Sequence, residues 1–266
     1  MGVKTLLTLQ EADQLFPSYN FVSIRATKNG IIDTTYIVRN SSGEYILKKY
    51  ERETGEKIQT QQALLKLLSA HNCNTPKYLQ KNQEWYLYTK LSGEIPKNVQ
   101  LYHIHALARF MAKLHNISKN FTNAAPFLAL YEINKLLASV KKSHYAYYKK
   151  LSCLHNLDHK YDGFIHGDIF TDNTLFDKEK IAVFDFIDGG LGEFSFDTAI
   201  ALLSFNPNNK RLHVNAFLRT YNQTSKKKIS YDELQKQLKI AAKFYALLRI
   251  NHDKKTKRAQ ELANFW

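Results

Sequence analysis

A loop with the spacing His-x-Asp-x-x-x-x-Asn constrains this chain more than any other feature of its sequence. The loop runs from His166 through Asp168 to Asn173, and a further aspartate, Asp185, ends the apolar strand pattern that begins at Ile181. An aspartate carboxylate can accept a proton from a hydroxyl, and carboxylate and amide oxygens are the ligands that Mg2+ prefers. Residue types, spacing and strand context together predict an enzyme that transfers a phosphoryl group from ATP to a hydroxyl.

Each polar residue of this segment has a predicted role. Asp168 and His166 are the predicted catalytic residues: Asp168 accepts the proton of the substrate hydroxyl, and His166 braces the loop by hydrogen bonds. Asn173, through its carbonyl oxygen, and Asp185 are the predicted Mg2+ ligands. Asp172 stays open between a hydrogen bond within the loop and a contact to the substrate. A turn rich in aspartate and asparagine followed by a strand is the plain structural alternative, but it does not call for this spacing.

Composition limits the class of protein. The chain has 266 residues, of which 44% are hydrophobic, so it can bury a sizeable core as one large domain or as two lobes. No apolar run approaches the roughly 18 residues that a membrane span requires, and the N-terminus lacks a signal-peptide pattern. Cys73 and Cys153 are too few for a disulfide framework or a zinc site. We therefore expect a reduced, cytoplasmic protein that does not bind membranes.

The formal net charge of +14 raises the question of nucleic-acid binding. The basic residues are scattered along the chain and are dense only at 226–228 and 254–258, and no known nucleic-acid-binding motif accompanies them. We interpret most of them as solvated helix faces, and a positive surface would also attract anionic ATP. A nucleic-acid partner is therefore not expected, although nucleic-acid binding remains an alternative hypothesis. The sequence does not predict an oligomeric state.

The residue patterns change from strands to helices along the chain. We predict an α+β protein with two lobes: a small antiparallel sheet lobe, residues 1–92, that binds the nucleotide, and a larger, mainly helical lobe, residues 93–266, that carries the catalytic loop and binds the acceptor. The predicted strands are 21–25, 34–38, 44–50 and 85–89, and the predicted helices are 57–70, 103–115, 128–148, 195–205, 212–221 and 231–250.

A lysine near the end of a small-lobe strand is the first candidate for nucleotide binding. From there Lys48 can reach the α- and β-phosphates of ATP. Its neighbour Lys49 competes for the role, and because strand residues alternate, only one of the two can face the nucleotide. We favour Lys48, which shares a face with Ile46. Protein kinases pair such a lysine with a helix glutamate, but the helix here offers glutamines, so the partner of Lys48 is not assigned. These glutamines are Gln59, Gln61 and Gln62.

Three further residues are predicted to contact the nucleotide. Gly30 and Thr34 belong to the loop 28–35, which could cover the phosphates, and Thr89 ends the last predicted strand of the small lobe. The loop has one glycine and is not a Gly-x-Gly-x-x-Gly motif, so a plain β-turn explains it equally well.

The segments 166–176, 183–193 and 196–199 resemble the aminoglycoside phosphotransferase and choline kinase superfamily. The resemblance implies a protein-kinase-like fold, ATP and Mg2+ as cofactors, and phosphorylation of a hydroxyl on a small metabolite or drug. It also implies that Asp197 is a buried carboxylate that braces the catalytic loop. A protein kinase is not expected, because the stretch between Asp185 and Asp197 has no room for an activation segment.

Within that superfamily the chain is most similar to the homoserine kinases of this fold, through the segments 30–36, 170–176 and 241–249. Lys48 is a departure, since those enzymes often lack a lysine there. Asp33 and Thr35 are departures as well, because both replace asparagines. These departures leave the acceptor open, with choline or ethanolamine kinases, aminoglycoside-type phosphotransferases and a non-catalytic nucleotide-binding relative as alternatives to a homoserine kinase.

Charge favours an amino-acid acceptor over a polycation. From residue 187 onward the chain has seven acidic and fourteen basic residues, whereas a pocket for an aminoglycoside should be rich in carboxylates. A zwitterionic amino acid needs one cation and one anion, which we predict to be Arg249 and either Asp188 or Asp33. A surface salt bridge explains Arg249 equally well. The 16 tyrosines and 16 phenylalanines keep choline open, since aromatic faces bind quaternary ammonium groups.

Overall fold

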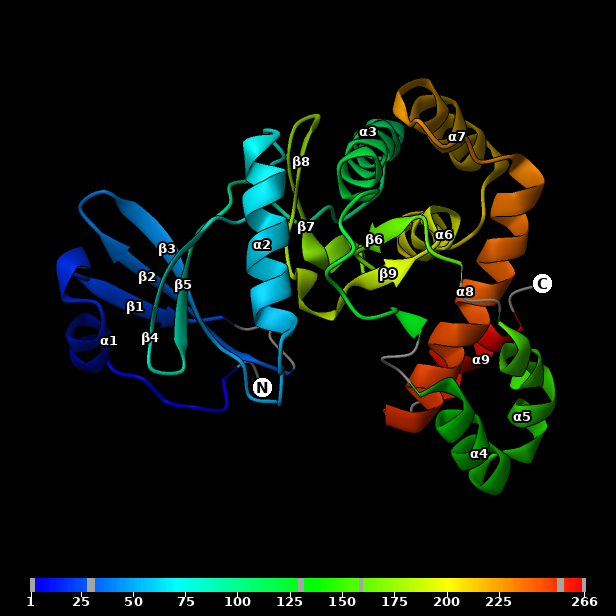
Figure 1. Cartoon of the computed structure of the whole chain (residues 1–266), viewed down its shortest axis with the longest axis horizontal. Helices are drawn as coiled ribbons and strands as arrows, with labels where there is room; N and C mark the ends of the chain where they lie inside the picture. The colour runs from blue at the N-terminus through cyan, green and yellow to red at the C-terminus, as the bar shows by residue number, and fades with distance from the viewer. Residues whose placement is uncertain (1–2, 28–31, 129–131, 158–159, 253–255, 265–266) are drawn as a thin grey trace. The chain divides into compact units, whose positions relative to one another are not determined.

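The computed structural model describes residues 3–27, 32–128, 132–157, 160–252 and 256–264. The chain divides into two compact units, Met1–Ser92 and Gly93–Trp266. The first unit is built around an antiparallel sheet and the second is mainly helical (Figure 1). The predicted α+β class is therefore confirmed.

The first unit holds a five-stranded antiparallel sheet with the strand order β1-β2-β3-β5-β4. Helix α1 precedes the sheet, and its first turn is closed by a capping box between Thr8 and Glu11. The elements are α1 (Leu9–Leu15), η1 (Pro17–Tyr19), β1 (Ser23–Ala26), β2 (Thr34–Asn40), β3 (Gly43–Lys49), α2 (Lys57–Ala70), β4 (Tyr78–Asn82) and β5 (Trp85–Thr89).

Strand alternation gives this sheet two different faces. On one face Leu47 and Leu87 are fully buried in a core that includes Phe16, beside α1. On the other face Tyr88 extends toward α2, where the buried Gln61 lies within hydrogen-bond distance of the Tyr88 hydroxyl. Consecutive residues of β3 therefore face different surroundings, which decides where its two lysines lie.

The second unit carries two short antiparallel strand pairs, β6 with β9 and β7 with β8, among helices. Helix α6 is apolar on nearly all sides and almost wholly buried, and it packs against α8. The elements are α3 (Leu101–Ser118), α4 (Ile133–Ser143), α5 (Tyr145–Leu151), η3 (Ser152–Asn156), β6 (Gly163–Ile165), η4 (Thr171–Asn173), β7 (Thr174–Asp177), β8 (Lys180–Val183), η5 (Phe186–Asp188), β9 (Gly190–Gly192), α6 (Phe194–Phe205), α7 (Arg211–Thr224), α8 (Tyr231–His252) and α9 (Thr256–Ala263).

The predicted helix 128–148 is wrong in one respect. The chain leaves the helical conformation at His144, where φ is −145° and ψ is 65°, and α4 and α5 are separate helices on either side. The apolar pattern alone did not reveal the break, because it continues on both sides of His144.

In the part of the chain that the structure describes, no helix is long and apolar enough to cross a membrane.

Candidate active site

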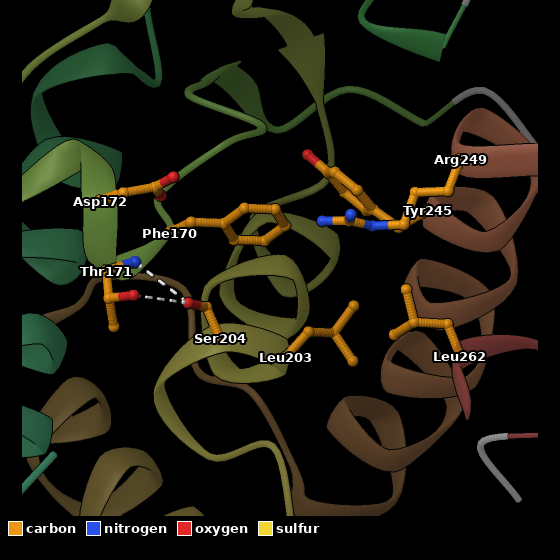
Figure 2. A pocket seen from close by; sticks show the side chains of 8 residues that line it. All are labelled: Phe170, Thr171, Asp172, Leu203, Ser204, Tyr245, Arg249 and Leu262. Carbon is orange, nitrogen blue, oxygen red and sulfur yellow. Dashed lines mark hydrogen bonds between the residues drawn. The ribbon is translucent and has the colours of Figure 1, made fainter. Parts of the chain in front are cut away.

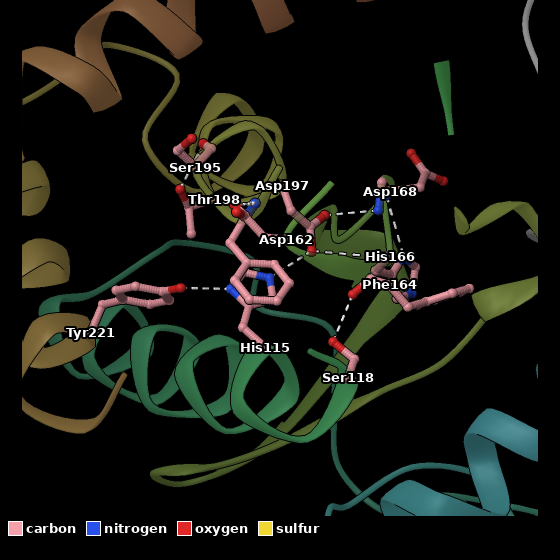
Figure 3. Close-up of polar contacts among 12 residues, drawn as sticks. His115, Ser118, Asp162, Phe164, His166, Asp168, Ser195, Asp197, Thr198 and Tyr221 are labelled. Carbon is pink, nitrogen blue, oxygen red and sulfur yellow. Dashed lines mark hydrogen bonds and ion pairs between the residues drawn. The ribbon is translucent and has the colours of Figure 1, made fainter. Parts of the chain in front are cut away.

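The catalytic loop is held by one fully buried carboxylate. Asp197, on α6, accepts a hydrogen bond from the backbone N–H of Gly167 at 2.8 Å and another from that of His166 at 3.2 Å (Figure 3). Burial alone would raise the pKa of Asp197, but the hydrogen bond from His115 and the other contacts outweigh burial and hold this pKa below its ordinary value. The bracing role expected for Asp197 is confirmed.

His115 extends this buried network to two more helices. Its Nε2 lies 3.0 Å from Asp197 Oδ2, and its Nδ1 lies 2.7 Å from the hydroxyl of Tyr221 on α7. Its ring stacks on Phe194 at 4.2 Å. In the sequence, His115 was only the last residue of the predicted helix 103–115.

His166 ties the catalytic loop to the end of β8. Its Nδ1 accepts a hydrogen bond from the backbone N–H of Asp168, at 3.2 Å. Its Nε2 therefore carries the proton and donates it to the carbonyl oxygen of Phe184, at 3.0 Å. Burial lowers the pKa of His166 and favours the neutral ring. Both ring nitrogens are engaged, so the geometry suits bracing of the loop better than proton transfer.

Asp168 is the candidate base, and its two carboxylate oxygens have different partners. Oδ2 accepts a hydrogen bond from Asn173 Nδ2 at 2.9 Å, and Oδ1 lies 3.1 Å from the hydroxyl of Tyr245 on α8. Burial raises the pKa of Asp168 to about 7, and the charges of Asp185 and other nearby acidic residues act in the same direction. The hydrogen bond from the Tyr245 hydroxyl opposes this shift. A carboxylate with a pKa near neutrality is well suited to general-base catalysis.

The β7–β8 hairpin brings the two predicted metal ligands to the same end. Thr174 pairs with Val183, so Asn173 and Asp185 lie just beyond that pair. Asp185 has φ +68°, a left-handed conformation that non-glycine residues adopt at a cost and that is frequent at functional sites. The amide nitrogen of Asn173 donates to Asp168, which leaves its carbonyl oxygen as the ligand atom.

The chemistry of this pair fits Mg2+. Both Asn173 and Asp185 offer oxygen, the donor that Mg2+ prefers, and Mg2+ is commonly held by one or two carboxylates together with substrate phosphates. Among the described residues, no group of three or more His, Cys, Asp or Glu side chains could hold a metal ion.

A cavity of about 280 Å3 opens beside the catalytic loop (Figure 2). Asp172 lies at one side of the cavity, and the guanidinium of Arg249 extends into it from the side of α8. Asp188 and Asp33, the predicted partners of a substrate amine, are not among the lining residues. The cavity is lined by Phe170, Thr171, Asp172, Leu203, Ser204, Tyr245, Arg249 and Leu262.

The two lysines of β3 face different partners in the first unit. Lys48 Nζ lies 3.5 Å from a carboxylate oxygen of Asp33 and 4.9 Å from the centre of the Tyr50 ring. Lys49 belongs to the other face and pairs with Glu84 at 2.6 Å. Gln61, the buried helix glutamine, donates to the hydroxyl of Tyr50 at 2.7 Å. Asp33 therefore supplies Lys48 with a carboxylate where the helix offers only amides.

Three other residues, Thr34, Thr89 and Gly30, were predicted to contact the nucleotide. The prediction for Thr34 is not supported, because strand alternation places it on the core face, fully buried, where its hydroxyl binds Glu51 and accepts from Thr5 N at 3.0 Å. Thr89 ends β5, and its hydroxyl accepts from Lys77 N at 2.9 Å; its contact with the nucleotide stays a prediction. Gly30 lies outside the described residues.

Comparison with known families identifies the chain. A model of the phosphotransferase enzyme family matches residues 23–235, which include the whole catalytic loop, Asp185 and Asp197. The chain belongs to the phosphotransferase enzyme family. The resemblance seen in the sequence is confirmed.

Two homoserine kinases are similar in sequence to this phosphotransferase. The chain is 22% identical to a homoserine kinase of Janthinobacterium sp. (strain Marseille), over 76% of this chain and 71% of that one. A homoserine kinase of Methylobacillus flagellatus is also 22% identical, over 94% of this chain and 87% of that one.

Two solved structures show the same architecture. The amicoumacin kinase in complex with AMP-PNP, Ca2+ and Ami superimposes with a TM-score of 0.72 at 17% identity, over 97% of this chain and 92% of that one. The macrolide 2'-phosphotransferase from Brachybacterium faecium gives 0.70 at 16% identity, over 96% and 98%. The phosphotransferase therefore has the kinase-like fold that the sequence predicted.

Removing the charge of Asp168 should separate activity from stability. We predict that Asp168→Asn lowers turnover by about 10²–10⁴-fold, because an amide cannot accept the hydroxyl proton. The pKa of Asp168 is about 7 in the folded protein and near 4 in the unfolded chain. At pH values above about 4, ionisation of Asp168 therefore lowers the free energy of unfolding. The melting temperature of the variant should therefore exceed that of the wild type by more at pH 8 than at pH 5. Calorimetry measures this, with the exposed Asp177→Asn as control; an equal shift at both pH values would contradict the prediction.

Loss of the Asp185 carboxylate should abolish metal-dependent nucleotide binding. We predict that Asp185→Ala binds an ATP analogue no better with Mg2+ than without it, because one of the two oxygen ligands is gone. Asp185→Asn, which tolerates the left-handed backbone, separates the loss of charge from backbone strain. Titration calorimetry with Asp177→Ala as control provides the measurement, and wild-type Mg2+ dependence in both Asp185 variants would show that the metal binds elsewhere.

The Asp33 carboxylate should matter for Lys48 and not for Lys49. We predict that Asp33→Asn raises KM for ATP by roughly tenfold, the equivalent of about 1.4 kcal/mol of binding, because Lys48 loses a charged partner. The matched control is Glu84→Gln, which removes the partner of Lys49 on the opposite face of β3. Steady-state kinetics with varied ATP tests this, and equal KM values for the two variants would contradict it.

Proposed function

We propose that this phosphotransferase transfers the γ-phosphate of ATP to the hydroxyl of a small zwitterionic amino acid, with L-homoserine as the favoured acceptor. The observation that carries the proposal is the placing of one carboxylate, Asp172, and one guanidinium, Arg249, on the lining of a single small cavity beside Asp168. The homoserine kinases among its relatives support the choice of acceptor.

Each charged group of the acceptor has a candidate partner in the cavity. Arg249 can bind the substrate carboxylate through two parallel hydrogen bonds, the strongest way in which proteins bind that group. Asp172, exposed in the loop, can bind the ammonium group and takes the place that the sequence analysis gave to Asp188 or Asp33. Phe170 and Tyr245 are aromatic neighbours whose ring centres lie 4.8 Å apart, and they offer apolar surface to the methylene groups.

The proposed reaction is a single in-line displacement. The acceptor hydroxyl gives its proton to Asp168 as its oxygen forms a bond with the γ-phosphorus. The bond between that phosphorus and the bridging oxygen of ATP breaks, and ADP leaves with the electron pair. Lys48 would contact the phosphates, and Asn173 and Asp185 would hold Mg2+. When bound, Mg2+ supplies positive charge that offsets the charge of the phosphates.

The charged groups of the cavity bear on the alternatives. Its lining has one carboxylate, Asp172, beside the guanidinium of Arg249, whereas a pocket for a polycationic aminoglycoside should be rich in carboxylates. Choline is the second candidate, because Phe170 and Tyr245 present aromatic faces to which a quaternary ammonium can bind. Arg249 opposes that choice, since choline carries no anionic group to pair with a guanidinium.

An ADP-release assay over L-homoserine, choline, ethanolamine, an aminoglycoside and methylthioribose tests the acceptor. We predict turnover of L-homoserine at the highest kcat/KM of the set. Turnover of choline without turnover of L-homoserine would reject the amino-acid acceptor but leave an alcohol kinase. Binding of Mg2+ and ATP without turnover of any acceptor would support a non-catalytic relative.

A variant of Arg249 tests how the acceptor is bound. Arg249→Gln should raise KM for L-homoserine by roughly tenfold to a hundredfold, as expected for loss of a hydrogen-bonded charge pair worth about 1.5–3 kcal/mol, with KM for ATP unchanged. Arg219→Gln, at an exposed position of α7, is the matched control. An unchanged KM for L-homoserine in Arg249→Gln would place the substrate carboxylate elsewhere.

A further inference from the structure

Tyr245 connects the acceptor cavity to the catalytic loop from the middle of α8. Its side chain lines the cavity, and the residue is only 7% exposed. Arg249 follows one helical turn later, so the two side chains extend from the same face of α8 (Figure 2). Phe170 and Phe244 pack against the Tyr245 ring at 4.8 and 5.3 Å. The ring therefore has a defined place beside the proposed carboxylate site of the acceptor.

The hydroxyl of Tyr245 reaches two oxygens of the catalytic loop. It lies within hydrogen-bond distance of the carbonyl oxygen of Gly167 and 3.1 Å from Asp168 Oδ1. A phenol has a single proton, so it can donate to only one of these oxygens at a time. Gly167 cannot move freely, because its N–H is bound to the buried Asp197. The hydroxyl thus has one fixed partner, and its other partner is the candidate base.

The Asp168 carboxylate has a donor group within reach of each of its two oxygens. Asn173 Nδ2 donates to Oδ2 at 2.9 Å, and Tyr245 approaches Oδ1. These contacts come from elements far apart in sequence, the loop itself and α8. A side chain with partners on both oxygens has a restricted rotation, and proton transfer depends steeply on such orientation.

We propose that Tyr245 is a positioning residue of the phosphotransferase: its hydroxyl orients the Asp168 carboxylate toward the acceptor hydroxyl, while its ring forms the cavity wall next to Arg249. The inference rests on the proposed function, because it takes Asp168 as the base. The Tyr245 side chain would then link the acceptor cavity to Asp168, the group that receives the proton of the acceptor.

Two substitutions divide the two roles of Tyr245. Tyr245→Phe removes the hydroxyl and keeps the ring, so kcat should fall roughly tenfold to a hundredfold while KM for the acceptor stays within about twofold of the wild-type value. Tyr245→Leu also removes the aromatic wall, so KM for the acceptor should rise as well. Tyr231→Phe, which removes a phenolic hydroxyl from the exposed start of the same helix, is the matched control and should leave both constants unchanged.

The experiment distinguishes failure of this inference from failure of the proposed function. Wild-type turnover across the acceptors tests the function, and the ratio of variant to wild type, with whichever acceptor is used, tests Tyr245. A crystal structure of Tyr245→Phe needs no acceptor: it should show the Asp168 carboxylate rotated away from its wild-type orientation. Wild-type kcat in Tyr245→Phe, or an Asp168 carboxylate that keeps its orientation in that crystal structure, would overturn the proposal.

Discussion

The rest of the site depends on the hydrogen bonds between the buried Asp197 carboxylate and the backbone of the catalytic loop. The carboxylate accepts hydrogen bonds from Gly167 N, His166 N and His115 Nε2, so its charge is hydrogen-bonded inside the core. A buried charge is costly unless it is fully paired, and loss of one partner of a buried pair is strongly destabilising. Movement of the loop away from α6 would leave this buried carboxylate without two of its donors. Gly167, at φ +73° and against the Phe127 ring, leaves no room for a side chain.

Two aspartates of the same site have opposite pKa shifts because their partners differ. Asp197 is surrounded by donors, which stabilise its charged form, so its pKa is below the ordinary value. Burial, together with the charges of Asp185 and the other nearby carboxylates, raises the pKa of Asp168 to about 7. Such divergence between neighbouring carboxyl groups separates a structural role from a chemical one. The raised pKa of Asp168 also means that the ionised form, which is needed for base catalysis, destabilises the folded protein. Such a conflict between stability and function is common at active sites.

Local features of the site could be predicted from sequence, whereas long-range ones could not. The spacing of Asp168, Asn173 and Asp185 fixes their relation because one loop and one hairpin carry all three. Thr34 is buried on the core face of the sheet, and the sequence alone did not show which face of its strand would be buried. The contact of Tyr245 with Asp168 and that of His115 with Asp197 were not predicted, because both residues reach these partners from other helices. On an apolar helix face, an aromatic or histidine residue usually belongs to the core. The fold class followed from the change from strand to helix patterns, but the break at His144 had no clear signal.

A crystal structure with a non-hydrolysable ATP analogue, Mg2+ and L-homoserine is the most direct test of the central claim that Asp168, Asn173 and Asp185 act on one phosphoryl group. The account predicts Mg2+ at about 2.0–2.1 Å from Asn173 Oδ1 and an Asp185 oxygen, and the homoserine hydroxyl at about 2.6–3.2 Å from an Asp168 oxygen. A metal bound away from Asn173 and Asp185, or an acceptor hydroxyl out of reach of Asp168, would contradict it.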